Sequence, residues 1–209
     1  MIIQIIGEYV KEKQMIKNMQ ECEECLPPIR LGYNDTYIKL SKERIIFITE
    51  EINKQLSSDL SALLLHYDNE NDEEISLYIN SPGGDVFALT NIYDVIQMIK
   101  SPIRTVCLGR CSSAAAVILA VGEKGRRAAM RNSKIMIHGM QARFPMPGQN
   151  VSSSKNLFQF MRGTNDNIMS ILARHTGQEM EKVRKDCERD LYFSAKEAKD
   201  YGLIDEIIG

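Results

Sequence analysis

The stretch GRCSSAAAVILAV at residues 109–121 predicts a junction between a strand and a helix. Residues 104–108 before it are mostly β-branched or apolar, which is typical of a buried strand in an α/β sheet. The small apolar residues after Ser113 favour a helix that Gly122 ends. The Ser113 hydroxyl would lie at the helix N-terminus, where unpaired N–H groups favour negative charge. Ser113 is therefore either a helix cap or a nucleophile whose developing oxyanion those N–H groups stabilise.

Strands and helices alternate on both sides of this junction. Apolar runs predict strands at residues 44–48, 75–79 and 134–138, and amphipathic patterns predict helices at 53–67 and 85–100. Such alternation indicates α/β architecture with parallel strand pairing. Further along the chain we expect a long helix over residues 151–174. Capping boxes at 176–179 and 194–197 predict two short helices after it.

The first 36 residues show no sustained pattern. An apolar start leads into a Lys/Glu-rich stretch, and the LPP sequence at residues 26–28 interrupts any helix. We interpret residues 1–36 as an N-terminal extension, namely a propeptide, a mobile arm, a partner-binding segment or simply a frayed terminus. Residues 37–209 contain no linker or internal repeat, so they are expected to form one domain.

Composition narrows the range of partners. The formal net charge is −2, which gives no reason to expect nucleic acid or an anionic membrane surface. No stretch approaches the roughly 18 consecutive apolar residues that a membrane span needs. Five cysteines suggest reduced thiols in a cytoplasm-like compartment. Cys22 and Cys25 have zinc-ligand spacing, but no second pair completes a site, so we expect neither a metal nor a cofactor.

Three histidines limit the choice of a general base. His66 falls within an amphipathic helix and is expected to be a packed or surface residue. His175 precedes a helix junction, where a solvated histidine is ordinary. His138 instead ends an apolar strand, the usual place for a catalytic group in an α/β fold, although a histidine at a strand end is more often structural.

The SPGG sequence at residues 81–84 ends another strand at the same edge of the sheet. A glycine lets a backbone N–H approach a substrate closely, so the N–H groups of Gly84 and Ala114 could form an oxyanion hole beside Ser113. The alternative is a tight turn between a strand and a helix. The chain lacks both the G-x-S-x-G elbow and the G-x-x-x-x-G-K-[ST] phosphate loop, so neither an α/β-hydrolase nor a P-loop ATPase is indicated.

Seven motifs in a fixed order resemble the proteolytic subunit of the Clp protease (ClpP), a family of serine peptidases. The resemblance runs from about Tyr37 to the C-terminus. It implies a crotonase-like fold of repeated β-α units with a long handle helix. It further implies heptameric rings that stack as a tetradecamer around a cytoplasmic chamber, where an AAA+ unfoldase (a Clp ATPase) delivers unfolded polypeptides. The motifs are LYINSPGG (77–84), IYD (92–94), AVGEKG (120–125), NSKIMIH (132–138), HTGQ (175–178), ERD (188–190) and YGLID (201–205).

This resemblance also assigns roles to individual residues. The family's nucleophile falls on Ser113, its base on His138 and its acid on Asp190, while the oxyanion donors fall on Gly84 and Ala114. Ser113 and His138 are 25 positions apart, as in the family. The neighbouring Ser112 and Cys111 are the rival nucleophiles. A triad is defined by its geometry, so the chain order Ser, His, Asp is acceptable.

Glu188 and Arg189 are implied to lie near the contact between two rings. The chain departs from the family after the histidine, where Gly139-Met140 replaces Gln-Pro, and again at Pro145 and Pro147. In the family that segment pairs with substrate as an added strand, and each proline removes an N–H from the same edge. We therefore expect weak peptidase activity, single rings or small assemblies from this chain alone.

Two alternative functions come from other classes. The first is a catalytically weak or inactive ring subunit that pairs with another ClpP paralogue. The second is an acyl-CoA enzyme of the crotonase superfamily, which polarises a thioester with two backbone N–H groups and needs no Ser–His pair. Labelling with a serine-directed fluorophosphonate separates an active peptidase from an inactive subunit.

Overall fold

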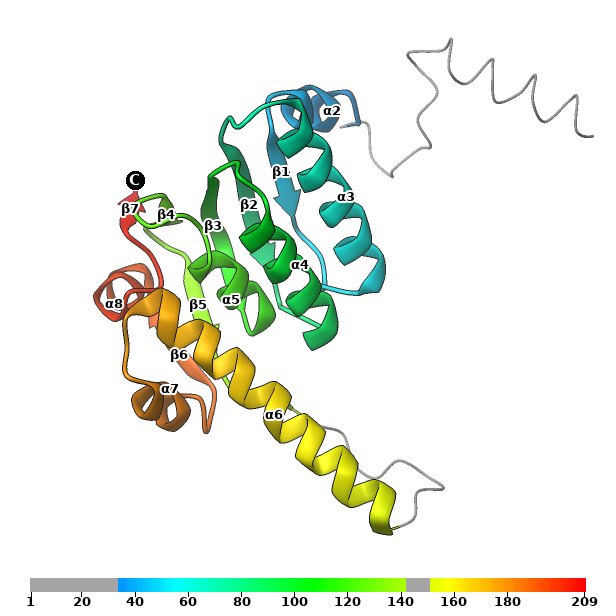
Figure 1. The fold of residues 1–209 in the computed structure, drawn as a ribbon. Coiled ribbons are helices and arrows are strands. Elements are labelled where there is room, and N and C mark those ends of the chain that lie inside the picture. The colour runs from blue at the N-terminus through cyan, green and yellow to red at the C-terminus, as the bar shows by residue number, and fades with distance from the viewer. Residues whose placement is uncertain (1–33, 142–150) are drawn as a thin grey trace, which may run out of the picture. The chain divides into compact units, whose positions relative to one another are not determined.

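The computed structural model describes residues 34–141 and 151–209. The chain divides into two units, Met1–Lys39 and Leu40–Gly209, and helix α2 (Asn34–Lys42) crosses the division. All strands and the helices α3 to α8 belong to the second unit (Figure 1).

Seven strands of the second unit form one sheet, in which β1, β2, β3, β4 and β7 lie in that order and β5 pairs with both β3 and β6. Every pairing is parallel except that between β5 and β6, so the expected parallel sheet is confirmed apart from this one antiparallel ladder. The strands β4, β6 and β7 were not predicted from the sequence. The strands are β1 (Ile45–Ile48), β2 (Ile75–Ser81), β3 (Ile103–Ser112), β4 (Arg127–Met130), β5 (Lys134–Ile137), β6 (Leu191–Ser194) and β7 (Glu206–Ile208).

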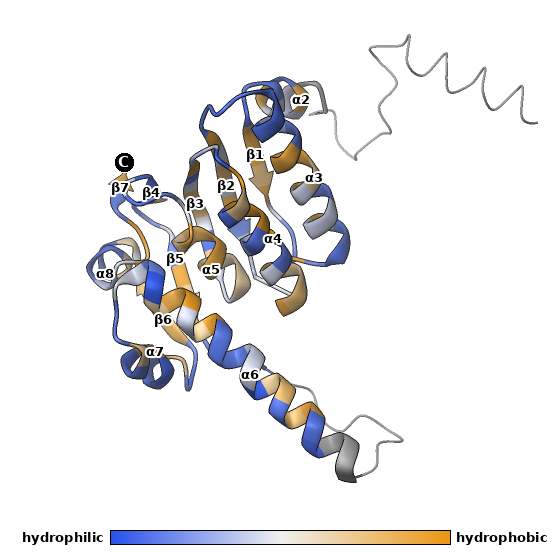
Figure 2. Ribbon diagram, in the orientation of Figure 1, coloured by the Kyte–Doolittle hydropathy of each residue, from blue (hydrophilic) through white to orange (hydrophobic). Residues whose placement is uncertain are grey.

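Helices α3, α4 and α5 lie side by side over the sheet, and the C-terminal half of the long helix α6 packs next to α5 (Figure 1). Their apolar faces and the strands form the core, in which Leu64, Ile79, Ile92 and Ile118 are fully buried. Figure 2 shows this concentration of hydrophobic residues in β1, β2, β3 and α5. The helices are α3 (Lys54–Glu70), α4 (Val86–Met98), α5 (Ala114–Ala120), α6 (Val151–Thr176), α7 (Met180–Asp186) and α8 (Ala195–Tyr201).

Side-chain caps explain where several helices begin. Asn53 and Asp85 each accept a hydrogen bond from the backbone three residues on, so α3 and α4 start directly after them. The predicted capping box at Ser194 is confirmed by reciprocal bonds with Glu197. The predicted box at Thr176 is wrong, because Thr176 is the last residue of α6 and its hydroxyl donates to the Leu172 carbonyl at 2.6 Å. The short helix expected after it is present as α7, which begins after Glu179.

Gly122 has a different role from the one expected. Helix α5 ends at Ala120, and its C-cap is Val121 in a right-handed conformation. A Cβ on Gly122 would lie 2.5 Å from Thr105 Oγ1. Close packing against β3, and not helix termination, therefore requires glycine at this position.

Strand β3 changes its neighbour along its length, and this change places β5 beside the C-terminal end of β3. Its first half pairs with β4 and its second half, Arg110 to Ser112, pairs with β5. Gly109 lies between the halves with φ of 86°, a left-handed conformation that favours glycine. The buried Ser133 hydroxyl stabilises the step by donating to the Cys107 carbonyl and accepting from the Gly109 N–H.

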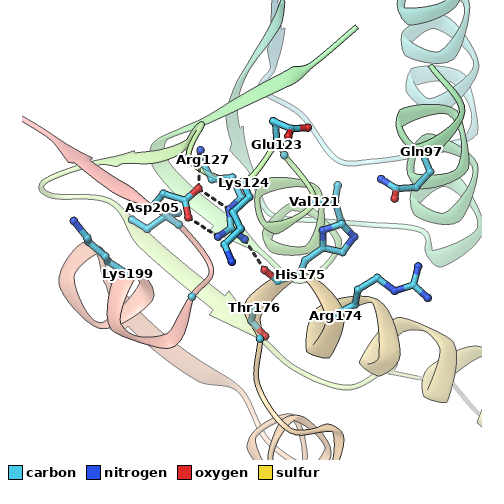
Figure 3. Close-up of a pocket in the computed structure, with 14 residues that line it drawn as sticks. Gln97, Val121, Glu123, Lys124, Arg127, Arg174, His175, Thr176, Lys199 and Asp205 are labelled. Carbon is cyan, nitrogen blue, oxygen red and sulfur yellow. Dashed lines mark hydrogen bonds and ion pairs between the residues drawn. The ribbon is translucent and has the colours of Figure 1, made fainter. Parts of the chain in front are cut away.

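At the start of β4, Arg127 joins four segments of the chain (Figure 3). Its guanidinium forms a bidentate ion pair with Asp205, with Nε–Oδ2 and Nη2–Oδ1 distances of 2.8 and 2.6 Å. It also donates to the carbonyls of Ala120 and His175, at the ends of α5 and α6. The pair borders a pocket of about 580 Å³ that contains none of the predicted site residues.

We expect Asp205→Ala to lower the free energy of unfolding by about 3 kcal/mol at pH 7, because it leaves the buried Arg127 charge unpaired. Burial raises the pKa of Asp205, but the hydrogen bonds and charge of Arg127 outweigh it and the net pKa is lowered. A carboxylate whose pKa is lowered in the folded state contributes fully to the free energy of unfolding when the pH is above its unfolded pKa of about 3.9. The deficit should therefore shrink as the pH falls through the folded pKa.

Urea denaturation of wild-type and variant protein across pH measures this deficit. The matched control is Asp166→Ala, which removes the exposed ion pair between Asp166 and Arg184. Exposed pairs contribute about 0–1 kcal/mol, so the control should change little. An equal effect of both variants would contradict the structural role given to Arg127.

Candidate active site

Ser113 occupies a strained turn between β3 and α5. Its backbone has φ of 56° and ψ of −125°, and only Arg44 shares a positive φ among the non-glycine residues of the described ranges. Its N–H donates to the Met136 carbonyl at 2.8 Å, and its own carbonyl accepts from the first turn of α5. Its hydroxyl makes no capping hydrogen bond. The helix-cap alternative is therefore excluded, and the turn holds an unbonded hydroxyl at a helix N-terminus.

The SPGG turn lies directly against Ser113. A Cβ on Gly83 would lie 2.4 Å from the Ser112 carbonyl oxygen and 2.7 Å from Ser113 Cβ. Gly84 is held by a bridge to Ile52, whose carbonyl oxygen would be 2.1 Å from a Cβ at Gly84. Both glycines are therefore needed for close backbone approach. Gly84 directly follows Gly83, and Ala114 directly follows Ser113 as the first residue of α5.

The rival nucleophiles are less accessible than Ser113, which is partly exposed. Ser112 is the last residue of β3, and only 7% of its surface is exposed. Cys111 is fully buried, and its thiol points to the Ile79 carbonyl with an Sγ–O distance of 3.6 Å. Burial, and then the neighbouring Cys107 thiol, raises the pKa of Cys111 well above its usual value. Cys111 therefore does not supply a reactive thiolate.

His138 follows β5, and Asp190 precedes β6. The antiparallel pairing of these strands, with Ile137 opposite Leu191, brings the two side chains together. The distance from His138 Nδ1 to Asp190 Oδ1 is 3.4 Å. The His138 side chain is 13% exposed and that of Asp190 is 44% exposed. The short strand β6, which the sequence did not predict, thus positions Asp190 beside His138.

The backbone after His138 is anchored to two other segments. The Gly139 N–H donates to the Cys187 carbonyl at 2.7 Å, and the Met140 N–H donates to Asn165 Oδ1 of α6 at 2.8 Å. Gly139 also has little room for a side chain, since a Cβ there would lie 3.1 Å from the Cys187 oxygen. The GM sequence therefore supplies two N–H anchors, one of which a proline at position 140 would lack. Neither Asn165 nor Cys187 carried a signal in the sequence.

Ser113 and His138 lie at the ends of two paired strands, because Ser112 is opposite Met136 in the ladder. Within residues 34–141 and 151–209, no hydrogen bond joins the Ser113 hydroxyl to His138. Catalytic hydrogen bonds often become short only when substrate binds. Glu188 and Arg189 are exposed, close to Asp190 in sequence. Cys22, Cys25, Pro145 and Pro147 lie outside the described residues.

The other histidines lie away from this edge. His66 is exposed on α3 with its Nε2 3.5 Å from Glu70, as expected of a surface residue. The expectation of a solvated His175 is wrong, because its ring is partly buried edge-on against Tyr93. Burial lowers the pKa of His175, and the charges of Arg127 and Arg174 lower it further.

The described part of the chain holds no group of three or more His, Cys, Asp or Glu side chains arranged to bind a metal ion. None of its helices combines the length and the hydropathy that a membrane span requires.

Comparison with known proteins adds three findings. A family model described as Clp protease matches residues 31–209. ATP-dependent Clp protease proteolytic subunit 2 of Frankia casuarinae is 45% identical over 175 residues, which are 83% of this chain and 79% of the relative. ATP-dependent Clp protease proteolytic subunit 3 of the same organism is 43% identical over 175 residues, or 83% of this chain and 81% of the relative.

Proposed function

Because this chain belongs to the Clp protease family, we propose that Ser113, His138 and Asp190 form the catalytic triad of a Clp-type serine peptidase. Its function is hydrolysis of peptide bonds in ATP-dependent protein degradation. The mixed α/β sheet is consistent with this family. The observation that carries the triad assignment is the strained Ser113 turn, which keeps the hydroxyl free of capping bonds at a helix N-terminus.

The proposed reaction uses each residue at a defined atom. Ser113 Oγ attacks the scissile carbonyl while His138 Nε2 takes its proton and then delivers that proton to the departing amine. Asp190 accepts a hydrogen bond from Nδ1–H, which leaves Nε2 free to act as a base and stabilises the imidazolium. Water then hydrolyses the acyl-enzyme with the same base.

The N–H groups of Gly84 and Ala114 are the proposed oxyanion donors. Ala114 is the first residue of α5, so its N–H has no acceptor within the helix. Gly83 packs against Ser112 and Ser113, which keeps the Gly84 turn at the nucleophile. Two fixed donors of this kind stabilise the tetrahedral intermediate by about 3–4 kcal/mol per donor in serine peptidases.

Labelling with a fluorophosphonate tests this function. The reagent reacts only with a serine that a base activates, so we expect the purified chain to carry one label, located on Ser113 by peptide mass spectrometry. The alternative of an inactive ring subunit predicts an assembled but unlabelled protein. An acyl-CoA enzyme of the crotonase type would also remain unlabelled, because its chemistry needs no activated serine.

Family membership supports ring assembly and partnership with a Clp ATPase. We further propose heptameric rings that stack in pairs, an AAA+ unfoldase as the ATPase, and unfolded polypeptides as substrates. The two relatives are numbered subunits of one organism, which favours a paralogous subunit as a partner in this chain's rings. A cytoplasmic location agrees with the three buried cysteines, Cys107, Cys111 and Cys187, which are free.

The domain organisation is part of the proposal. Residues 37–209 form the peptidase domain, and residues 1–36 form an extension that is a propeptide, an arm or an axial segment. The support is that the family match begins at residue 31 and that the sheet begins at Ile45. N-terminal sequencing of the mature protein decides between a propeptide and a retained segment.

We expect Arg189→Ala to reduce both the oligomer size and the peptidase activity. Arg189 is exposed in this subunit and follows Glu188, one residue from Asp190, so a contact made there by a second ring would bear on the acid of the triad. Native mass spectrometry and a peptidase assay on one sample measure both quantities. The matched control is Arg184→Ala, which removes an exposed arginine of α7 that already pairs within the subunit. Full activity from a particle of normal mass would exclude the ring-contact role.

A further inference from the structure

Two side chains compete for one nitrogen of His138. Gln141 Nε2 lies 3.1 Å from His138 Nδ1, within the range of an N–H hydrogen bond. Asp190 Oδ1 lies 3.4 Å from the same atom, which is longer than such bonds usually are. In this subunit the closer partner of Nδ1 is therefore the glutamine and not the carboxylate.

The two partners require opposite tautomers of a neutral imidazole. The Gln141 amide nitrogen can only donate, so it needs an unprotonated Nδ1 and leaves the ring proton on Nε2. The Asp190 carboxylate can only accept, so it needs Nδ1–H and leaves Nε2 free. A base for Ser113 requires the second tautomer. The contact of Gln141 Nε2 with Nδ1 thus holds His138 in the form that cannot take the serine proton.

The position of Gln141 suits a reversible restraint. The backbone is anchored as far as Met140 by its bond to Asn165, and Gln141 is the next residue. Its side chain is exposed, so it can leave Nδ1 without opening the core. Asp190 is also partly exposed, so its carboxylate can then reach Nδ1 by a small movement. The proton moves from Nε2 to Nδ1 through solvent, and no other reactant is needed.

We propose that Gln141 is a positioning residue that restrains His138 in the non-productive tautomer in competition with Asp190. The inference rests on the proposed triad. It makes the isolated subunit slow because the base is held in the wrong protonation state, while the fold and the nucleophile are intact. Any contact that draws Gln141 away from Nδ1, from substrate or from another subunit, releases the base.

Removal of the donor tests the proposal. Gln141→Leu should raise kcat for a short peptide by about three- to tenfold with KM unchanged. This range is expected when one modest hydrogen bond no longer biases the equilibrium between the two tautomers of His138. Gln141→Glu should also raise kcat, because its carboxylate accepts from Nδ1–H. In the double variant, Gln141→Glu should recover part of the activity that Asp190→Asn loses. Gln55→Leu, on an exposed glutamine of α3, is the matched control and should have no effect.

The tautomer itself is read from 15N spectra of histidine-labelled protein at about pH 8, where imidazole side chains are neutral. The chain has only three histidines, and the His138→Gln variant identifies the signals of His138. We expect Nδ1 to be unprotonated in the wild type and protonated in Gln141→Leu. An unchanged Nδ1 signal, or a fall in kcat in Gln141→Leu, overturns the proposal. The spectrum does not depend on activity, so failure of the triad assignment would be recognised separately as a fully active Ser113→Ala variant.

Discussion

Replacing Ser113 by alanine is expected to lower kcat for a short peptide by at least about 10⁴-fold. The change removes one hydroxyl oxygen and keeps the Cβ, so the strained turn and the bond from its N–H to the Met136 carbonyl are the same in both proteins. Assembly should therefore be unaffected. A peptidase assay measures the loss, and native mass spectrometry of the same sample measures the particle.

Ser112→Ala is the matched control, because it removes the same atom from the preceding residue. Ser112 is buried at the end of β3, and the variant should keep most of the activity. An inactive Ser112→Ala with an active Ser113→Ala would place the nucleophile one residue earlier. Full activity of both variants would remove the serine mechanism from this turn altogether.

Asp190→Asn is expected to lower kcat by about 10²- to 10⁴-fold without unfolding the protein. Asparagine has nearly the same shape, but its amide nitrogen donates to Nδ1 and thus favours the tautomer with the proton on Nε2. The lower part of the range allows for the 44% exposure of the Asp190 side chain and its 3.4 Å separation from Nδ1. The peptidase assay gives kcat, and a thermal melt by circular dichroism shows that the variant is folded.

Asp200→Asn, on the exposed surface of α8, is the control for a neutralised aspartate near the C-terminus. It should change kcat little. If Asp190→Asn retained wild-type kcat, a different group would have to orient His138, and Asp190 would be only a surface residue beside β6.

The strained backbone of Ser113 keeps its hydroxyl from capping α5. A parallel ladder places the two strand ends side by side, but a helix N-cap serine would normally use its hydroxyl for capping. The unusual backbone of Ser113 turns the hydroxyl away from that use, and the packing of Gly83 and α5 maintains the strain. The proposed acceptor of its proton, His138, follows the neighbouring strand β5.

Most of the regular elements were predictable from local pattern. Apolar runs indicated β1, β2, β3 and β5, the spacing of leucines and isoleucines indicated α3 and α4, and a long helical segment was expected where α6 lies. These signals are strong because burial of one face acts on many residues in sequence. The order of the motifs likewise pointed to the family that the comparisons show, and to Ser113, His138 and Asp190 as candidates.

By itself the sequence determined which segments form strands and helices, which family the chain belongs to, and which side chains are candidates for chemistry. Only the tertiary structure decided how those side chains meet. Asp190 directly precedes the antiparallel strand β6, and the pairing of β6 with β5, which brings Asp190 to His138, left no local pattern. The same holds for Ser113, whose backbone follows from packing against Gly83, and for Gln141, whose contact with His138 follows from the anchoring of Gly139 and Met140. Each of these contacts joins segments whose interaction energy depends on the folded arrangement and not on neighbouring residues in the chain.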